Sequence, residues 1–374
     1  MTVRTVAAAV AALTAAACSP SFDPPSEVKG FRLLAIRASP PEIAPADDPD
    51  PAQAHAAALD TLIASPAFLA ERDRRAVVLH VACTPEPGNA AESPCTALTQ
   101  LADPTGLLAA GLTDEAACTA PGVGKVNAIT FSGVETCGLA GCGPVSVPLD
   151  PGNPGVTATL APPRYALPAD FTFSSLPPGD PGRILGLEAV DLALALDVDP
   201  AALAPTSPVA SDCEALQAFA ARFLAAWPGA AHVTALKRIV IRGPEARNAA
   251  NRNPAVAGVT YDAGVEPWPR LTLPGAPTPT ALRPGAHVEL LPDTTGDDVE
   301  RYLQIDASGA IITEKDEDRA WSWFSTGGKL KYDHTTRADE KLEFKPGAGP
   351  ALMWLVVRDL RGGLAWTVAE VKGE

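Results

Sequence analysis

The sequence predicts a mainly β protein built from two antiparallel β-sandwich domains. Its 39 prolines fall between short runs of β-branched residues, as expected because proline is excluded from central strands and collects in turns and edges. In the C-terminal part, alternating strand patterns recur with turn signals about every 8–12 residues, which is typical of a sandwich. A chain of 374 residues is also long for one domain of about 100–200 residues, which favours two.

The first domain is expected over residues 30–246. Residues 31–38 read as its first strand, which Pro40 ends because proline lacks a backbone donor. Residues 47–75 read as helical, since Asp50 can cap a helix that has Pro51 at its first position. This pattern predicts a helix near 51–72. Residues 76–83 then alternate as a core strand, with His80 on the face opposite the apolar side chains.

A turn-rich insertion is expected over residues 84–182, with short strands at 126–131, 145–149 and 156–160. A strand pattern resumes at 184–198, and a helix is predicted over 212–227. Ser211 and Glu214 form a capping box at its start, where each side chain can satisfy a free backbone N–H. Residues 235–242 are expected to close the domain, and the polar stretch 243–254 is interpreted as a hinge.

The second domain is expected over residues 247–374. Residues 286–290 alternate strictly between apolar and polar side chains, and two strands at 301–306 and 311–314 flank a turn. Trp321 and Trp323 share one face of a further strand. Residues 353–358 and 365–371 are predicted to pair as a terminal hairpin, because the glycines of the intervening loop allow the positive φ angles of a tight reversal.

The N-terminus is built like an export signal. Residues 1–17 contain one charge, Arg4, followed by an apolar run too short to span a bilayer, and end in small residues before Cys18. The arrangement resembles the lipobox of bacterial lipoproteins, which implies that Cys18 is acylated and anchors the chain to a membrane. Residues 18–29 are then a stiff, proline-rich tether. In the lipoproteins that this segment resembles, a residue such as Ser19 after the cysteine implies export to the outer membrane. The alternatives are an ordinary cleaved signal with a chance cysteine and a short buried helix.

Three further stretches resemble a set of uncharacterised bacterial putative lipoproteins with immunoglobulin-like β-sandwich domains. They are GFRLLAIRASPPE at 30–42, RNPAVAGV at 252–259, and WFSTGG at 323–328 with WLVVRDLRGG at 354–363. The resemblance implies that both sandwiches are immunoglobulin-like and that the protein is exported. Those proteins run directly from the proline pair into the next strand, whereas here the predicted helical insertion follows Pro45. The resemblance implies no activity, because a fold does not define a function.

Besides Cys18 the chain holds an even number of cysteines. In an exported protein they are expected to form disulfides, and the candidates are Cys83, Cys95, Cys118, Cys137, Cys142 and Cys213. Sequence cannot choose among the 15 possible connectivities of six cysteines. The short spacing between Cys137 and Cys142 suggests a local bridge. Cys83 with Cys95 and Cys118 with Cys213 would then remain. A zinc site that includes His80 is the alternative, although paired C-x-x-C units are lacking, so no metal is expected.

Charge and motifs limit the function. A net charge of −15 argues against nucleic acid and against electrostatic docking on an anionic membrane. The sequence contains no serine-hydrolase elbow, zinc-protease helix, P-loop or dinucleotide fingerprint. No enzyme activity and no cofactor are therefore expected. The carboxylates of residues 293–300 are interpreted as a solvated turn, with calcium binding as the alternative.

The resulting hypothesis is a non-catalytic binding or structural module of the cell envelope. Its expected contacts are the membrane, through the lipid anchor, and an unknown envelope protein or glycan. A carbohydrate-binding accessory protein is the second hypothesis, which would use exposed aromatic residues, with Trp321 and Trp366 as candidates. A divergent hydrolase is the third. It would require a buried carboxylate or histidine pair with perturbed pKa values in a cleft.

Overall fold

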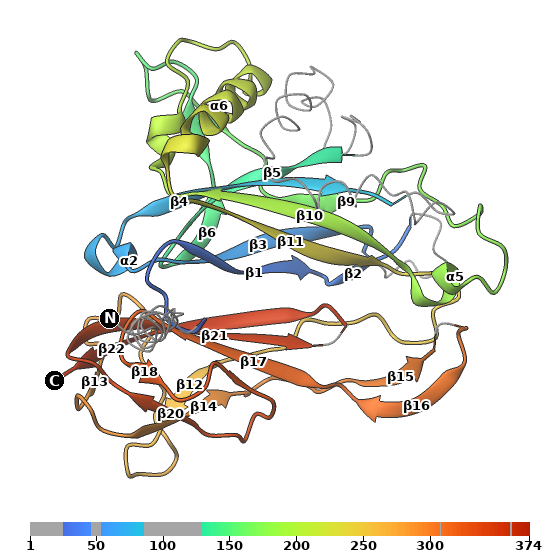
Figure 1. Ribbon diagram of the computed structural model, residues 1–374. Helices are drawn as coiled ribbons and strands as arrows, with labels where there is room; N and C mark the ends of the chain where they lie inside the picture. The colour runs from blue at the N-terminus through green and yellow to red at the C-terminus, as the bar shows by residue number, and fades with distance from the viewer. Residues whose placement is uncertain (1–24, 46–53, 86–128, 307, 360) are drawn as a thin grey trace, which may run out of the picture.

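A computed structural model of the chain describes residues 25–45, 54–85, 129–306, 308–359 and 361–374. The described chain is mainly β and forms two antiparallel sandwiches that lie one above the other (Figure 1). None of the helices in these parts of the chain has the length and hydropathy needed to cross a bilayer. The fold class expected from the sequence is therefore confirmed.

The first sandwich pairs a three-stranded sheet with a six-stranded sheet. The smaller sheet has the order β1 (Arg32–Ser39), β3 (Ala56–Ala64), β9 (Arg164–Ala166). The larger has the order β2 (Glu42–Ile43), β11 (His232–Ile241), β10 (Leu187–Leu196), β4 (Arg75–Cys83), β5 (Ile129–Gly138), β6 (Gly141–Pro144). The chain passes from one sheet to the other between β1 and β2, and β2 runs parallel to the last strand, β11. Two mainly antiparallel sheets packed face to face are the architecture of an immunoglobulin-like sandwich.

The prediction of a helix near residues 51–72 is wrong. Residues 46–53 lie outside the described chain, and the longest element in the remainder is strand β3, followed by the single-turn helix α2 (Ala67–Ala70). β3 lies between two layers, so Leu59 packs toward the six-stranded sheet and Leu62 toward the second sandwich. Burial on both faces of a strand, together with the β-branched residues Thr61 and Ile63, outweighs the helix propensity of the alanines.

The outer face of the six-stranded sheet is covered by α6 (Asp212–Ala226), which begins at the Ser211 cap as the sequence predicted. Phe219 and Phe223 of α6 pack against the leucines of β10. Further small elements complete this domain: β7 (Ser146–Pro148), β8 (Thr157–Thr159), α5 (Pro181–Leu185), η3 (Pro200–Leu203) and η4 (Trp227–Gly229). The first sandwich therefore carries its additions on one outer face and at its ends.

The second sandwich repeats the same scheme. One sheet has the order β12 (Gly258–Tyr261), β14 (Val288–Asp293), β20 (Leu342–Lys345), β18 (Lys329–Leu330). The other has the order β13 (Thr280–Leu282), β22 (Leu364–Gly373), β21 (Gly349–Asp359), β17 (Arg319–Ser325), β19 (His334–Thr335). β13 runs parallel to the last strand, β22. A separate hairpin of β15 (Arg301–Ile305) and β16 (Ile311–Asp316) extends from this domain. The predicted terminal hairpin is β21–β22, and Gly362 has a φ of +98° in its loop.

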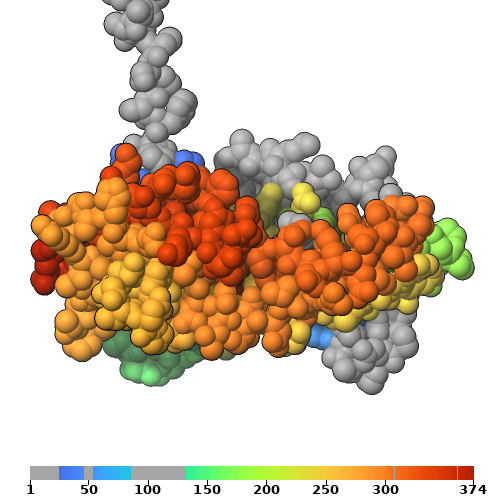
Figure 2. Space-filling model, turned by 90° about the horizontal axis from the view of Figure 1, so that it is seen from below, coloured from blue at the N-terminus to red at the C-terminus, as the bar shows by residue number. Residues whose placement is uncertain are grey.

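The two sandwiches share an apolar core. Trp354 and Val356 of β21 belong to the same buried cluster as Leu62 and Phe68 of the first domain. Figure 2 views the molecule from below and shows the second sandwich, in orange and red, extending over most of that side. Because the shared surface consists of apolar side chains from both domains, the sandwiches pack as one body.

Polar contacts reinforce this packing. Arg72 of the first domain binds both carboxylate oxygens of Glu370, at 2.5 and 2.9 Å, and Glu370 is 1% exposed. The Asn253 side chain donates to the Ala38 carbonyl, and its oxygen accepts from the N–H of Leu364. The stretch expected to act as a hinge therefore ties the two domains together.

Candidate functional site

A buried ionic cluster occupies the centre of the first sandwich. His80 lies on β4, Asp191 on β10 and Glu135 on β5, three neighbouring strands of the six-stranded sheet. Alternate residues of a strand share one face, and this face points toward Thr61 of β3. The opposite face of β4 carries Val77, Leu79 and Val81 against α6.

His80 is held between two carboxylates. Its Nδ1 lies 2.8 Å from Asp191 Oδ2, and its Nε2 lies 3.2 Å from Glu135 Oε1 and 3.3 Å from Thr61 Oγ1. Burial alone would lower the pKa of His80, but the two carboxylates outweigh it and raise this pKa to about 10. Burial also raises the pKa of Asp191. His80 is therefore a cation at neutral pH, and it partly neutralises two buried acids.

This cluster has the composition of an acid–base site without its accessibility. His80 and Asp191 are fully buried and Glu135 is 4% exposed, and none of these three side chains lines the cavities described below. A general acid or base must reach its substrate directly or through one water. The arrangement thus supplies the perturbed pKa values that a divergent hydrolase requires, but in the interior of a domain and not in a cleft.

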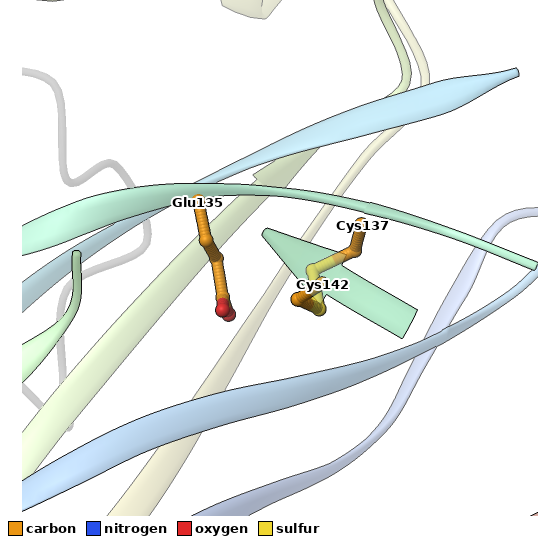
Figure 3. Close-up of side chains that lie close together, drawn as sticks. All are labelled: Glu135, Cys137 and Cys142. Atoms are coloured by element: carbon orange, nitrogen blue, oxygen red, sulfur yellow. A yellow bond between two sulfur atoms is a disulfide. The ribbon is translucent and has the colours of Figure 1, made fainter. Parts of the chain in front are cut away.

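Glu135 also lies beside a disulfide, as Figure 3 shows. The ligand atoms of Glu135, Cys137 and Cys142 lie within 4.8 Å of one another, the only such group of metal-binding side chains among the residues described. The two sulfurs are bonded to each other, so neither is the thiolate that binds a metal. The grouping is therefore a disulfide beside a carboxylate, and the predicted local bridge between Cys137 and Cys142 is confirmed. Cys83 and Cys213 are also disulfide-bonded, whereas Cys18, Cys95 and Cys118 lie outside the described residues.

The Cys137–Cys142 bridge closes the β5–β6 hairpin, which faces the ionic cluster. Replacing both cysteines by alanine is expected to lower the free energy of unfolding by about 2 kcal/mol, since a short loop is no longer closed in the unfolded chain. Urea unfolding of the variant measures this loss. Alanine at Ser146 and Thr159, a cross-strand pair on β7 and β8, is the matched control and should cost less than about 0.5 kcal/mol. Equal stability of the cysteine variant and the wild type would contradict the prediction.

The aromatic candidates lie in packed surroundings. Trp321 is 1% exposed in the core of the second sandwich. Trp366 is half-buried between the domains, where the Arg37 guanidinium lies 4.5 Å from its ring centre. It lines a cavity of about 370 Å³ together with Phe68 and Trp354. These two tryptophans therefore do not form an exposed row on one face.

The acidic stretch 293–300 is bound by arginines. Asp293 pairs with Arg270, Asp297 with Arg319, and Glu300 with both Arg252 and Arg361. None of these carboxylates belongs to a group close enough to hold a metal ion in the described part of the chain. The loop is thus a network of ion pairs, and nothing in it favours calcium.

An open groove lies at the junction of the two sandwiches. Its larger part is a cavity of about 580 Å³ between α5 and β11 of the first domain and β15 of the second. Figure 1 shows α5 above β15 at one end of the molecule. A smaller cavity of about 250 Å³ adjoins it and shares Asp359 and Gly362 as lining residues. We call the two together the interdomain groove. Domain junctions and volumes of about 300–1,000 Å³ are typical of ligand sites.

Cationic side chains outnumber acidic ones in the interdomain groove, whereas acidic residues prevail in the chain as a whole. The cationic lining residues are Lys237, Arg238, Arg242, Arg247, Arg358 and Arg361, and the acidic ones are Glu42, Glu188 and Asp359. Arg242 and Arg361 both pair with the buried Glu42, at 3.6 and 3.3 Å. Burial lowers the pKa of Lys237 to about 8, and its ammonium donates to the carbonyl of Gly362.

Sequence reasoning missed both of these features. His80 and Asp191 each interrupt a run that is apolar on both strand faces, and an isolated ionisable residue in such a run is a signal for a buried, paired charge. The groove arginines come from two distant parts of the chain, near residues 238–247 and at 358–361. No local pattern connects those segments.

No family model and no curated protein matches this chain. Among solved structures, Escherichia coli alpha-2-macroglobulin activated by porcine elastase matches with 11% identity and a TM-score of 0.19, over 93% of this chain and 22% of that one. The native conformation of E. coli alpha-2-macroglobulin, from cryo-EM, matches with 11% identity and a TM-score of 0.18, over 92% and 17%. This chain thus spans about a fifth of those proteins. TM-scores this low support no inference about the fold or the function of this chain.

Proposed function

We propose that this chain is a lipid-anchored protein of the bacterial cell envelope, and that its two sandwiches act together as a non-catalytic binding module. The observation that carries the proposal is the interdomain groove, an open, charged site held between two domains that share one core. A rigid junction favours binding because little conformational entropy is lost when a partner docks.

The alternative hypotheses lack this support. An acid–base site would need access to a substrate, and the His80 cluster is sealed inside the first sandwich. Glycan binding through an aromatic row would need Trp321 at the surface, but it is 1% exposed. The membrane anchor rests on the sequence around Cys18. In the described chain, residues 26–28 pair with Ser325 of β17, so the end of the proposed tether is attached to the second sandwich.

The anchor is tested by replacing Cys18 with serine. We expect the wild-type chain to incorporate a labelled fatty acid and to fractionate with membranes, and the C18S variant to do neither, because the serine hydroxyl does not replace the acylated thiol. A C18S chain that still carries the label would show that Cys18 is not the acylation site. A wild-type chain without label would rule out the anchor.

Binding in the groove is tested by site-specific photo-crosslinking in intact cells. A photoreactive residue at Leu185 or Leu236, which are 47% and 45% exposed and line the groove, is expected to give defined protein adducts. The same residue at Val265, which is 60% exposed and lines none of the cavities described, is the control. Adducts at all three positions, or at none, would count against a binding site in the groove.

A further inference from the structure

Among the residues that the structure describes, the edge of the six-stranded sheet at β11 has few hydrogen-bonding partners. One side of β11 pairs with β10 along its whole length, from His232 to Ile241. Its other side pairs with β2 only at Val240 and Ile241. No other strand of the described chain pairs with that side. An edge strand with free N–H and C=O groups is a template for pairing with another chain.

The register identifies which backbone groups are free. The N–H of Arg242 donates to the Ile43 carbonyl on the β2 side. In an antiparallel strand the N–H and C=O of alternate residues point to the same side. Arg238, Leu236 and Thr234 therefore direct their backbone groups toward the open edge. All three residues are exposed.

The interdomain groove runs beside this edge. Its smaller cavity is lined by Ala235, Leu236 and Lys237 of β11, facing residues 33–36 of β1. Its larger cavity is lined by Arg238 and Val240 farther along the same strand. An extended chain placed there would contact both cavities in succession.

Two arginines remain available for an anionic partner. Arg247 is exposed and makes no ion pair with another described residue, and Arg238 lies 3.5 Å from Glu188 in a pair whose side chains are 75% and 53% exposed. Such a solvent-exposed pair is weak and exchanges readily. Arginine recognises carboxylates with two parallel hydrogen bonds, so acidic side chains are the complementary groups.

We propose that the interdomain groove binds an extended acidic segment of a partner protein, which adds as a strand to the free edge of β11. This proposal rests on the proposed function, because it assigns a partner class to the same site. A small anion would use the arginines but leave the strand edge unpaired, whereas a β segment uses both. Its apolar side chains would pack near Leu34 and Leu236, so the segment is expected to alternate acidic and apolar residues.

The test uses the full chain in detergent and a labelled peptide of about twelve residues that alternates glutamate and valine, with binding followed by fluorescence anisotropy. We expect saturable binding that weakens as salt is added. The double variant Arg238→Ala/Arg247→Ala should bind at least about tenfold more weakly. The matched control, Arg164→Ala/Arg337→Ala, removes two exposed arginines outside the groove and should bind as the wild type does. Equal binding of a lysine–valine peptide would overturn the proposal.

Two further arms test strand addition itself. Leu236→Pro removes a donor from the open edge while leaving the β10 pairing intact, and it should weaken binding at least about tenfold relative to Leu236→Ala. Should the proline variant fail to fold, a peptide N-methylated at alternate residues tests the same point on the wild-type chain and should also bind weakly. Strand pairing would be excluded if the methylated peptide bound as tightly as the unmodified one. It would also be excluded if the methylated peptide displaced the unmodified peptide with equal potency. Competition by inorganic phosphate together with full binding of the methylated peptide would identify a simple anion site instead.

These results are separable from those for the proposed function. If adducts form at Leu236 in cells but the acidic peptide does not bind, the proposal of a binding module stands and the proposal of an acidic partner segment is wrong. If the peptide binds but no adducts form, the groove can bind an acidic segment, and the proposal that it binds a partner in the cell envelope is wrong.

Discussion

Replacement of His80 by leucine is expected to lower the free energy of unfolding at pH 7 by about 3–5 kcal/mol, measured by urea unfolding. The substitution introduces an apolar side chain of similar size and removes the cation between Asp191 and Glu135, which are 0% and 4% exposed. Two like charges then remain buried without a partner, and Asp191 Oδ1 already lacks a hydrogen bond to any residue that the structure describes. The loss follows from uncompensated charge and not from a cavity.

Two comparisons separate this explanation from a general effect of losing a histidine. His232 is exposed, its Nδ1 contacts the carbonyl of Ala230, and its ring stacks on Trp227. Its replacement by alanine should cost about 1 kcal/mol, mainly through the lost stacking. A triple variant with leucine at positions 80, 135 and 191 should be more stable than the single His80→Leu variant, because no buried charge is left. If the triple variant were the least stable of the set, the electrostatic account would be wrong.

The same cluster predicts how stability depends on pH. The pKa of His80 in the folded chain is about 10, above its ordinary value of 6.5, so the folded state retains its proton where the unfolded state has lost it. Its contribution is fully present below pH 6.5 and is lost as the pH rises through about 10. The wild type should lose on the order of 5 kcal/mol across this window. The His80→Leu variant should lack this part of the pH dependence, and an identical profile would contradict a charged His80.

Replacement of Trp354 by alanine is expected to be the most damaging change at the domain junction, with a loss of about 3–5 kcal/mol. Trp354 is 1% exposed and belongs to the cluster shared by both sandwiches. It also borders the cavity of about 370 Å³ lined by Phe68 and Trp366, which the truncation would enlarge. Because this cluster couples the domains, we expect one urea transition for the wild type and two for the variant.

Tyr332 provides the control for this experiment. It is 53% exposed, and its replacement by alanine should change the free energy of unfolding by less than about 0.5 kcal/mol. Tryptophan fluorescence and far-ultraviolet circular dichroism should give coincident transitions for the wild type and separate transitions for Trp354→Ala. A single transition with unchanged midpoint in the variant would mean that the apolar contact does not couple the domains.

Local sequence patterns were enough to predict much of the fold. The alternation in β4 and β14, the Ser211 cap of α6 and the Gly362 reversal of the terminal hairpin depend on residues close in sequence, and each was predicted. β3 was mistaken for a helix because Asp50 and Pro51, just before it, match the start of a helix. Its conformation depends on layers above and below it, which no local window contains.

The sequence by itself determined the mainly β class, the division into two sandwiches and the bridge between Cys137 and Cys142. These features depend on the alternation of apolar and polar residues, on prolines and glycines in turns, and on the short spacing of two cysteines, all of which act over a few residues. Only the tertiary structure decided where the charges meet. His80 lies 55 positions from Glu135 and 111 from Asp191, and the groove joins β11 to the β21–β22 loop of the other domain. Electrostatic interactions depend on distance in space and on burial, and both are established only when the sheets have packed.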